Sequence, residues 1–147
     1  MRFSTESLTA VTARPESAAA VRFTQICTCR VSHPSTKAGS CFAQLLRSPR
    51  LSLARELDLC GNDLGNGGVN LLTRSPHLRN LRSLDLSFNG ISDTGLVVLG
   101  AAENLPGLRD LRLNDNGPFS QRGVTALAES ANLANLEGLD VSACGLD

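Results

Sequence analysis

Residues 81–108 read LRSLDLSFNGISDTGLVVLGAAENLPGL and contain one full period of a repeating pattern. The first half, from Leu81 to Ile91, has the form L-x-x-L-x-L-x-x-N-x-I. The second half carries apolar residues at helical spacing from Gly95 onwards. Apolar side chains alternate along a half-buried strand and recur every three or four residues along a helix. This stretch therefore predicts a short strand, a loop and a helix.

The same pattern returns 27 residues earlier, 27 residues later and then after a further step of 28 residues. The corresponding positions are Leu57, Leu59 and Asn62 in the preceding unit, Leu111, Leu113 and Asn116 in the next one, and Leu139, Val141 and Cys144 in the last. We expect Asn62, Asn89 and Asn116 to stack inside successive turns and to bond backbone groups that the bend leaves unpaired. Cys144 takes this position in the last unit, where a small buried thiol can substitute.

These residues resemble the leucine-rich repeat family, and the period together with the Asn/Cys position most resembles its ribonuclease-inhibitor-like class. The segment RSPHLRNLRSLDLSFNGISDTGL also resembles the repeat arrays of large bacterial proteins. The resemblance implies an α/β leucine-rich repeat solenoid, a horseshoe of about four repeats with a parallel concave sheet and convex helices. It implies a scaffold that binds other proteins through the concave sheet and adjoining loops, and it assigns no catalytic residue.

The pattern divides the chain into three parts. Residues 1–25 carry no sustained apolar periodicity and are expected to form a disordered or frayed leader. Residues 26–40 are a candidate for a degenerate first repeat, with Cys29 in its strand. Residues 41–147 form the repeat domain, whose last repeat is truncated and leaves the C-terminal end uncapped. Such an end favours a fragment of a longer array, or self-association through the open end.

Polar residues mark the expected helix starts. Ser40 is the expected N-cap of a helix over residues 40–48, and Asn66, Asp93 and Ser120 are expected to start the later helices. Gly68, Gly95 and Gly123 recur just inside these helices. Because glycine is a poor helix former, its recurrence suggests a tight approach between the helix and strand layers.

The composition limits the partners and the compartment. The formal net charge is zero, with 14 basic and 14 acidic residues, so no overall field favours nucleic acid or an anionic membrane. No apolar run is as long as a membrane span, and the N-terminus lacks the hydrophobic region of a secretory signal. Five cysteines, an odd number, favour reduced thiols and a cytoplasmic protein. The Arg, Ser, Thr and Ala content of the leader also resembles that of an organelle transit peptide.

The strand positions predict which side chains face a partner. An acidic row alongside a row of arginines is expected on the concave side, with an aromatic residue at its rim. The candidate protein-binding residues are Arg55, Asp58, Arg82, Asp85, Phe88, Arg109, Asp110, Arg112 and Asp140. The alternative is that neighbouring repeats merely balance each other's charge on a solvated face, where ion pairs contribute about 0–1 kcal/mol. Phe88 is equally compatible with an exposed anchor and with packing over the Asn89 turn.

No enzymatic motif or cofactor site is visible in the sequence, so a non-enzymatic binding module is the favoured function. Cys27, Cys29, His33 and Cys41 have poor spacing for zinc, and no metal is expected. Cys60 is expected to face outward as a modifiable thiol. Two alternatives stay open. One is a regulatory segment of the substrate-receptor or GTPase-activator kind, and the other is a structural piece of a longer array without a partner of its own.

Overall fold

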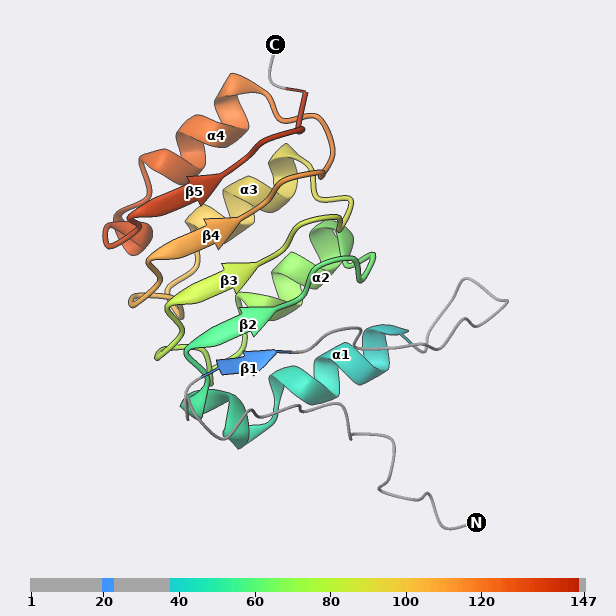
Figure 1. Cartoon of the computed structure of the whole chain (residues 1–147), viewed down its shortest axis with the longest axis vertical. Helices are drawn as coiled ribbons and strands as arrows, with labels where there is room; N and C mark the ends of the chain where they lie inside the picture. Colours follow the sequence, from blue (N-terminus) through green and yellow to red (C-terminus); the bar gives the residue numbers. More distant parts are fainter. Residues whose placement is uncertain (1–19, 23–37, 146–147) are drawn as a thin grey trace.

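The structure, a computed structural model, describes residues 20–22 and 38–145. Within these residues a five-stranded parallel sheet has its strands in chain order (Figure 1). The strands are β1 (Ala20–Arg22), β2 (Glu56–Asp58), β3 (Ser83–Asp85), β4 (Asp110–Arg112) and β5 (Gly138–Asp140). This sheet with its intervening helices is the α/β arrangement that the repeating pattern predicts.

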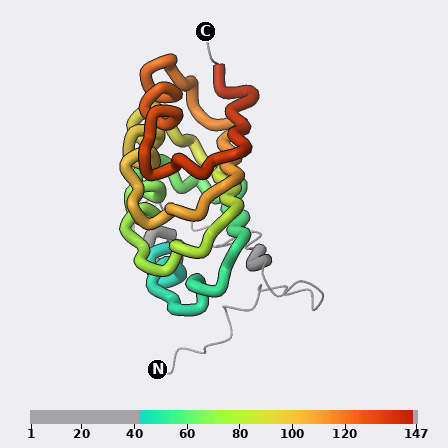
Figure 2. The backbone as a smooth tube through the Cα atoms, turned by 90° about the vertical axis from the view of Figure 1, so that its left-hand side faces the viewer, coloured from blue at the N-terminus to red at the C-terminus, as the bar shows by residue number. Residues whose placement is uncertain are grey.

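Four helices lie together on one side of the sheet (Figure 1). They are α1 (Ala38–Leu46), α2 (Gly65–Leu72), α3 (Asp93–Gly100) and α4 (Gln121–Ala128), and two 3-10 turns, η2 (Pro49–Leu53) and η3 (Ala131–Leu133), precede β2 and β5. The chain winds along one axis in successive turns of similar shape (Figure 2). Each turn therefore packs chiefly on the turns before and after it.

The register of the sheet aligns the central leucine of each strand. Leu57 pairs with Leu84, Leu84 with Leu111, and Leu111 with Leu139. Leu84 is completely buried, as are Leu86 beside it and Leu96 and Leu99 on α3. Burial of one such side chain stabilises the fold by about 1.5–3 kcal/mol. The core is thus a set of stacked leucine layers between the sheet and the helices.

The first strand differs from the sequence prediction. β1 (Ala20–Arg22) pairs in parallel with β2, and Val21 lies opposite Leu57. This strand belongs to the segment that we assigned to a leader, and it precedes β2 by more than one repeat length. The strand predicted within residues 26–40 lies mostly outside the described residues, and so do most of residues 1–25. A strand pairs through its backbone N–H and C=O groups, so β1 joins the sheet without the residue spacing of the later repeats.

The later helices begin within one residue of Asn66, Asp93 and Ser120, as predicted, but only Ser120 among the four polar residues is an N-cap. α1 already begins at Ala38, so Ser40 lies inside the helix, and the capping position of α2 is Leu64. Asp93 is the first residue of α3 and not its cap. Ser120 is the N-cap of α4, and its hydroxyl accepts a hydrogen bond from the N–H of Gly123.

The side chains at these helix starts bond the neighbouring repeat. Asn66 Nδ2 donates to Ser92 Oγ at 2.8 Å, and Asn66 Oδ1 accepts from the N–H of Ser92 at 3.0 Å. The Asp93 carboxylate accepts from both the N–H and the hydroxyl of Ser120, at 2.8 and 2.5 Å. Side chains that were expected to cap the helix of their own repeat therefore connect successive helices.

These contacts explain the recurring helix glycines. A Cβ on Gly95 would meet the Asn66 side chain and the Ile91 side chain, and one on Gly123 would meet Asp93. The expectation of tight approach was right, but its location between helix and strand layers was wrong. The close neighbour at Gly95 and Gly123 includes the polar side chain of the preceding repeat, which has to pass the helix start to reach its partner.

Candidate protein-binding face

A row of amides fixes the turns that follow the strands. Asn89 is completely buried, and its Nδ2 donates to the carbonyls of Leu59, Leu86 and Ser87 at 2.9–3.0 Å. Its Oδ1 accepts from the backbone N–H groups of Asn62 and Leu64 at 3.1 and 3.2 Å. One side chain thus connects its own turn to the preceding turn and satisfies backbone groups of both.

The other predicted members of this row lie at equivalent places. Asn62 Nδ2 donates to the carbonyls of Leu59 and Cys60, and Asn116 Nδ2 donates to those of Leu86 and Leu113. Cys144 is buried, and its thiol donates to the carbonyl of Leu113 at 3.1 Å. The row holds the strand ends in register, so the residues around it present their side chains at fixed places.

The outer surface of the sheet is a shallow hollow of about 650 Å³ with mostly acidic walls. It is lined by residues from β2 to β5, and the charged ones are Glu56, Asp58, Asp85, Asp110, Arg112 and Asp140. The structure therefore brings the predicted acidic row together on one face, with Arg112 as the one basic residue among the residues that line it. We call this surface the sheet face.

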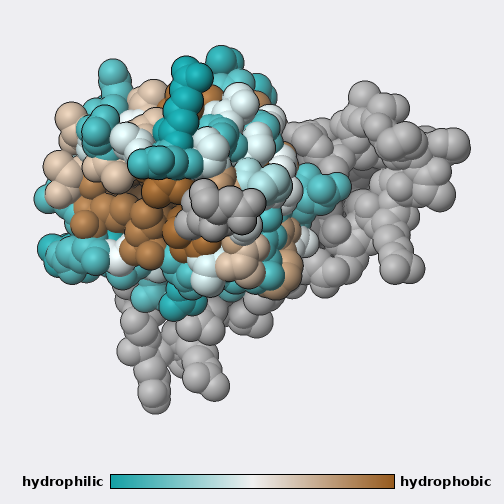
Figure 3. Space-filling view, turned by 90° about the horizontal axis from the view of Figure 1, so that it is seen from above, coloured by the Kyte–Doolittle hydropathy of each residue, from teal (hydrophilic) through white to brown (hydrophobic). Residues whose placement is uncertain are grey.

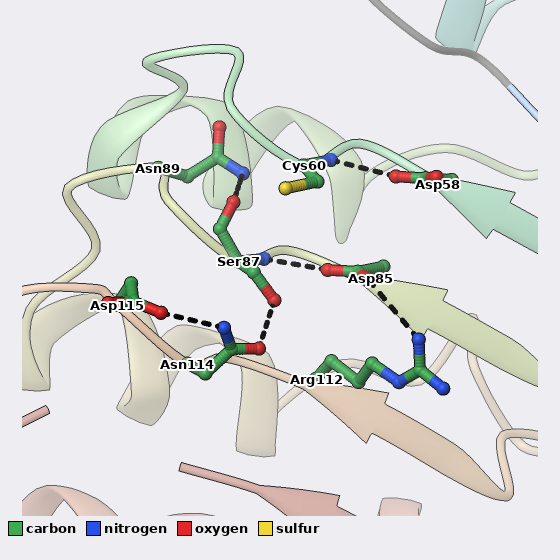
Figure 4. Close-up of polar contacts among 8 residues, drawn as sticks. All are labelled: Asp58, Cys60, Asp85, Ser87, Asn89, Arg112, Asn114 and Asp115. Atoms are coloured by element: carbon green, nitrogen blue, oxygen red, sulfur yellow. Dashed lines mark hydrogen bonds and ion pairs between the residues drawn. The ribbon is translucent and has the colours of Figure 1, made fainter. Parts of the chain in front are cut away.

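Three aspartates of the sheet face also have a local structural role. Asp58, Asp85 and Asp140 each accept a hydrogen bond from the N–H two residues further on, at 2.9–3.1 Å. Figure 4 shows the bonds of Asp58 and Asp85. The N–H and hydroxyl of Ser142 lower the pKa of the Asp140 carboxyl below its ordinary value. Part of the acidic row thus helps to shape the strand ends.

Arg112 occupies the aspartate position in β4 and faces β3. Its guanidinium lies 3.7 Å from the Asp85 carboxylate, and its side chain is 65% exposed (Figure 4). An exposed pair at this distance contributes about 0–1 kcal/mol to stability. Arg112 is therefore not required to neutralise the sheet face, and most of its surface is open to a partner.

Phe88 stands at the end of β3 with a backbone that favours glycine. Its φ is +55°, and the residues at the same place in the other repeats, Gly61, Asp115 and Ala143, also have positive φ. The Phe88 side chain is 55% exposed, so the alternative in which it packs over the Asn89 turn is wrong for most of its surface. A non-glycine residue in this conformation costs about 1–2 kcal/mol.

The predicted arginine row lies where the chain enters the strands. The backbone N–H groups of Arg82 and Ser83 both donate to the carbonyl of Arg55, and those of Arg109 and Asp110 donate to Arg82. Arg109 forms an ion pair of 2.8 Å with Glu137, which takes the arginine position in the last repeat. No ion pair with another described residue engages Arg55 or Arg82. The row borders a groove that is separate from the hollow of the sheet face.

Cys60 is exposed at the end of β2, as the strand pattern predicts. Partial removal from water raises the pKa of its thiol above the ordinary value, and the carboxylates of Asp85, Asp58 and Asp115 raise it further. The thiolate is therefore disfavoured at this place, which argues against a reactive cysteine.

The outermost strand leaves part of the core open. Leu139 of β5 is 38% exposed, whereas Leu84 and Leu111 at the same register are at most 1% exposed. Figure 3 looks onto the end of the stack formed by α4 and β5, and it shows apolar residues gathered at the centre with hydrophilic residues around them.

Residues 20–22 and 38–145 include no group of His, Cys, Asp and Glu side chains placed to hold a metal ion. Cys27, Cys29 and His33, which we considered as zinc ligands, lie outside this part of the chain, as does the side chain of Cys41. Of the helices in the same residues, none has the length and apolar character needed to cross a bilayer.

Comparison with known proteins gives one match. Residues 77–100 match a family model described as Leucine Rich repeat. They include β3, the Asn89 turn and the whole of α3, so the matched unit is the middle of the stack, with Leu84, Leu86, Leu96 and Leu99 in its completely buried core. No curated protein matches the chain. The chain thus contains a leucine-rich repeat, and repeats of this family are generally protein-interaction modules that are typically non-catalytic.

Proposed function

We propose that this protein is a non-enzymatic interaction module that binds a partner protein through the sheet face and the adjoining loops. The observation that carries the proposal is Phe88, a half-exposed aromatic side chain held in a backbone conformation that favours glycine. Gly61, Asp115 and Ala143 share this backbone conformation, so the aromatic side chain is what distinguishes this repeat. Aromatic residues dominate the binding energy of protein interfaces. The repeat to which Phe88 belongs matches a family of interaction modules.

The charges next to Phe88 support the proposal. The sheet face carries five carboxylates and one arginine over its hollow. A partner surface with basic side chains would meet these carboxylates, and it would gain specificity and association rate from the complementary charge. Phe88 at the rim would supply the apolar anchor that such a polar surface otherwise lacks.

The test uses two substitutions that the repeat itself permits. Phe88→Gly introduces the residue found at Gly61, and Arg112→Asp introduces the residue found at Asp58, Asp85 and Asp140. Both changes therefore suit the local backbone. The full chain and each variant are immobilised at equal density, and the proteins captured from cells are quantified by mass spectrometry.

We expect specific captured proteins to be lost with the double variant Phe88→Gly, Arg112→Asp. Val97→Thr is the matched control, because Val97 is 48% exposed on α3, on the helix side. A protein that both the wild type and the control retain, and that the double variant loses, supports the proposal. Identical captured sets for all three chains would contradict it.

We further propose that the units build a horseshoe of the ribonuclease-inhibitor-like class. The helices on one side and the amide row with its 27-residue step support this assignment. Residues 41–147 would then be one repeat domain. Unpaired thiols at Cys60 and Cys144 favour a reducing, cytoplasmic setting. A structural piece of a longer array without a partner predicts no specific captured protein, so the capture experiment separates this alternative from a direct binding role.

A second candidate function is self-association through the end that carries β5. The observation that favours it is the exposure of Leu139 in a register position that is otherwise buried. Light scattering on a sizing column tests it over a range of concentrations. Dimers in the wild type and monomers in Leu139→Asp would support self-association, and concentration-independent monomers in both would refute it.

A further inference from the structure

The arginine row opens into a second hollow, beside the strand starts, with a volume of about 450 Å³. We call it the arginine groove. Four loops from successive repeats form it, and the residues that matter here are Leu53, Arg55, Arg79, Arg82, Arg109 and Glu137. Neighbouring strands lie about 4.8 Å apart, so a groove across four repeats is about 14 Å long. A single small anion would fill only the width of about one strand spacing in this groove.

The walls of the arginine groove are fixed by hydrogen bonds between repeats. Asn80 Nδ2 donates to the carbonyl of Ser52 at 2.7 Å, and Asn135 Nδ2 donates to that of Pro106 at 2.8 Å. The carbonyls of Arg55, Arg82 and Arg109 each accept two N–H groups from the next repeat. The backbone of the groove is thus set before any ligand binds, which lowers the entropic cost of binding.

Three of the four arginines that line the groove form no ion pair with a described carboxylate. Arg109 is paired with Glu137 at 2.8 Å. Within residues 42–145, no carboxylate forms an ion pair with Arg55, Arg79 or Arg82, although all three are exposed. Three guanidinium groups in one groove attract carboxylates, which they can bind through two parallel N–H donors each.

One apolar residue marks the end of the groove away from Glu137. Leu53, at the end of η2, is 74% exposed and is the most exposed large apolar residue in the described part of the chain. A ligand that contacts the arginines can therefore also cover a leucine. Carboxylates together with an apolar side chain are features of an acidic peptide.

We propose that the arginine groove binds an acidic peptide segment of the partner, with carboxylates against Arg55, Arg79 and Arg82 and an apolar residue against Leu53. This inference rests on the proposed function and specifies the chemistry of the partner. About four extended residues span the groove, because an extended chain advances about 3.3 Å per residue. The partner would thus present an acidic segment to the groove and basic side chains to the sheet face.

The test measures the fluorescence anisotropy of labelled peptides titrated with the full chain at low salt. The probe contains four glutamates and one leucine, with the leucine at either end in two versions. A peptide in which glutamine replaces each glutamate is the uncharged control. We expect saturable binding of at least one acidic version, no saturation with the glutamine peptide, and weaker binding as salt is raised.

Arg82→Glu is the decisive variant, because the last repeat already carries Glu137 at this position and the fold accepts it. We expect a loss of at least tenfold in affinity, and a smaller loss for Leu53→Ser. Arg74→Glu makes the same charge change on an exposed residue outside the groove and should bind as the wild type does. Equal effects of Arg82→Glu and Arg74→Glu would overturn the proposal.

Two other results would also overturn it. One is the absence of saturable binding of either acidic peptide, and the other is tighter binding of an oligothymidylate than of the peptides. Neither result bears on the capture experiment, which depends on Phe88 and Arg112. Failure of the acidic-peptide inference is thus distinguishable from failure of the proposed binding function.

Discussion

Replacement of Asn89 by alanine tests how the stack is held together. The carbonyls that Asn89 engages each keep a second donor, from Asn62 Nδ2, Asn116 Nδ2 and the N–H of Gly61. The N–H groups of Asn62 and Leu64 lose the acceptor that Asn89 Oδ1 offers them. Both N–H groups lie in partly buried hydrogen bonds. One such bond contributes about 0.5–1.5 kcal/mol, so the two losses predict about 1–3 kcal/mol.

The assay is equilibrium unfolding in urea, followed by circular dichroism, for the full chain and each variant. Asn89→Asp is a second variant, because it keeps the acceptor oxygens but removes the donors and buries a charge beside three carbonyls. We expect it to be at least as unstable as Asn89→Ala at neutral pH. Asn70→Ala is the control, since Asn70 is exposed on α2, and it should change the free energy of unfolding by less than about 0.5 kcal/mol. An equally small change for Asn89→Ala would refute the role of the amide row.

Three further predictions concern single residues. Leu84→Ala should lower the free energy of unfolding by about 2–5 kcal/mol, because Leu84 is completely buried in the middle layer; a loss below about 0.5 kcal/mol in urea unfolding would mean that the register is wrong. Phe88→Gly should raise the free energy of unfolding by about 1 kcal/mol through relief of the left-handed backbone, and a destabilised variant would show that the Phe88 side chain packs usefully. Hydrogen bonds from the hydroxyl and N–H of Ser120 lower the pKa of Asp93 below its ordinary value of 3.8. The stability that the ionised Asp93 carboxylate contributes is therefore complete above this pH and is lost as the pH falls through the lower pKa of the folded state. Unfolding between pH 5 and pH 2 should therefore show a steeper loss of stability for the wild type than for Ser120→Ala, and parallel curves would contradict this.

The architecture could be predicted from the sequence because each repeat carries the same residue types at the same positions. Leu84, Leu86 and Asn89 have counterparts at a constant step, so strand, turn and helix could be placed without any long-range information. The start of the sheet could not be predicted in this way. Val21 is in register with Leu57 although its neighbours carry no repeat signature, and only the pairing itself identifies β1.

The helix N-caps show why capping preferences, applied to one repeat at a time, gave the wrong role for these side chains. Asn66 and Asp93 are good capping residues in isolation, yet both bond the next repeat. Asn66 and Asp93 stand 27 residues apart, and each is followed by a glycine two residues later, which was the available signal. It indicates contacts between repeats as well as caps within them, and a reading one unit at a time cannot distinguish the two.

The candidate binding residues were predictable in position but not in environment. The sequence placed Arg55, Arg82 and Arg109 in one row, but the groove also needs Arg79 and Leu53, which lie outside the strand motif. Phe88 was visible as an unusual residue after the strand. Its backbone conformation, which makes it informative, depends on the turn that the buried Asn89 imposes.

The most direct test of the binding function is hydrogen–deuterium exchange of the full chain with and without the partner isolated by capture. Our account predicts added protection in the strand-side segments, residues 52–60, 79–88 and 107–115, and unchanged exchange in α3 and α4. Protection confined to α3 and α4, with no change on the strand side, would contradict the claim that the sheet face and its adjoining loops form the binding surface.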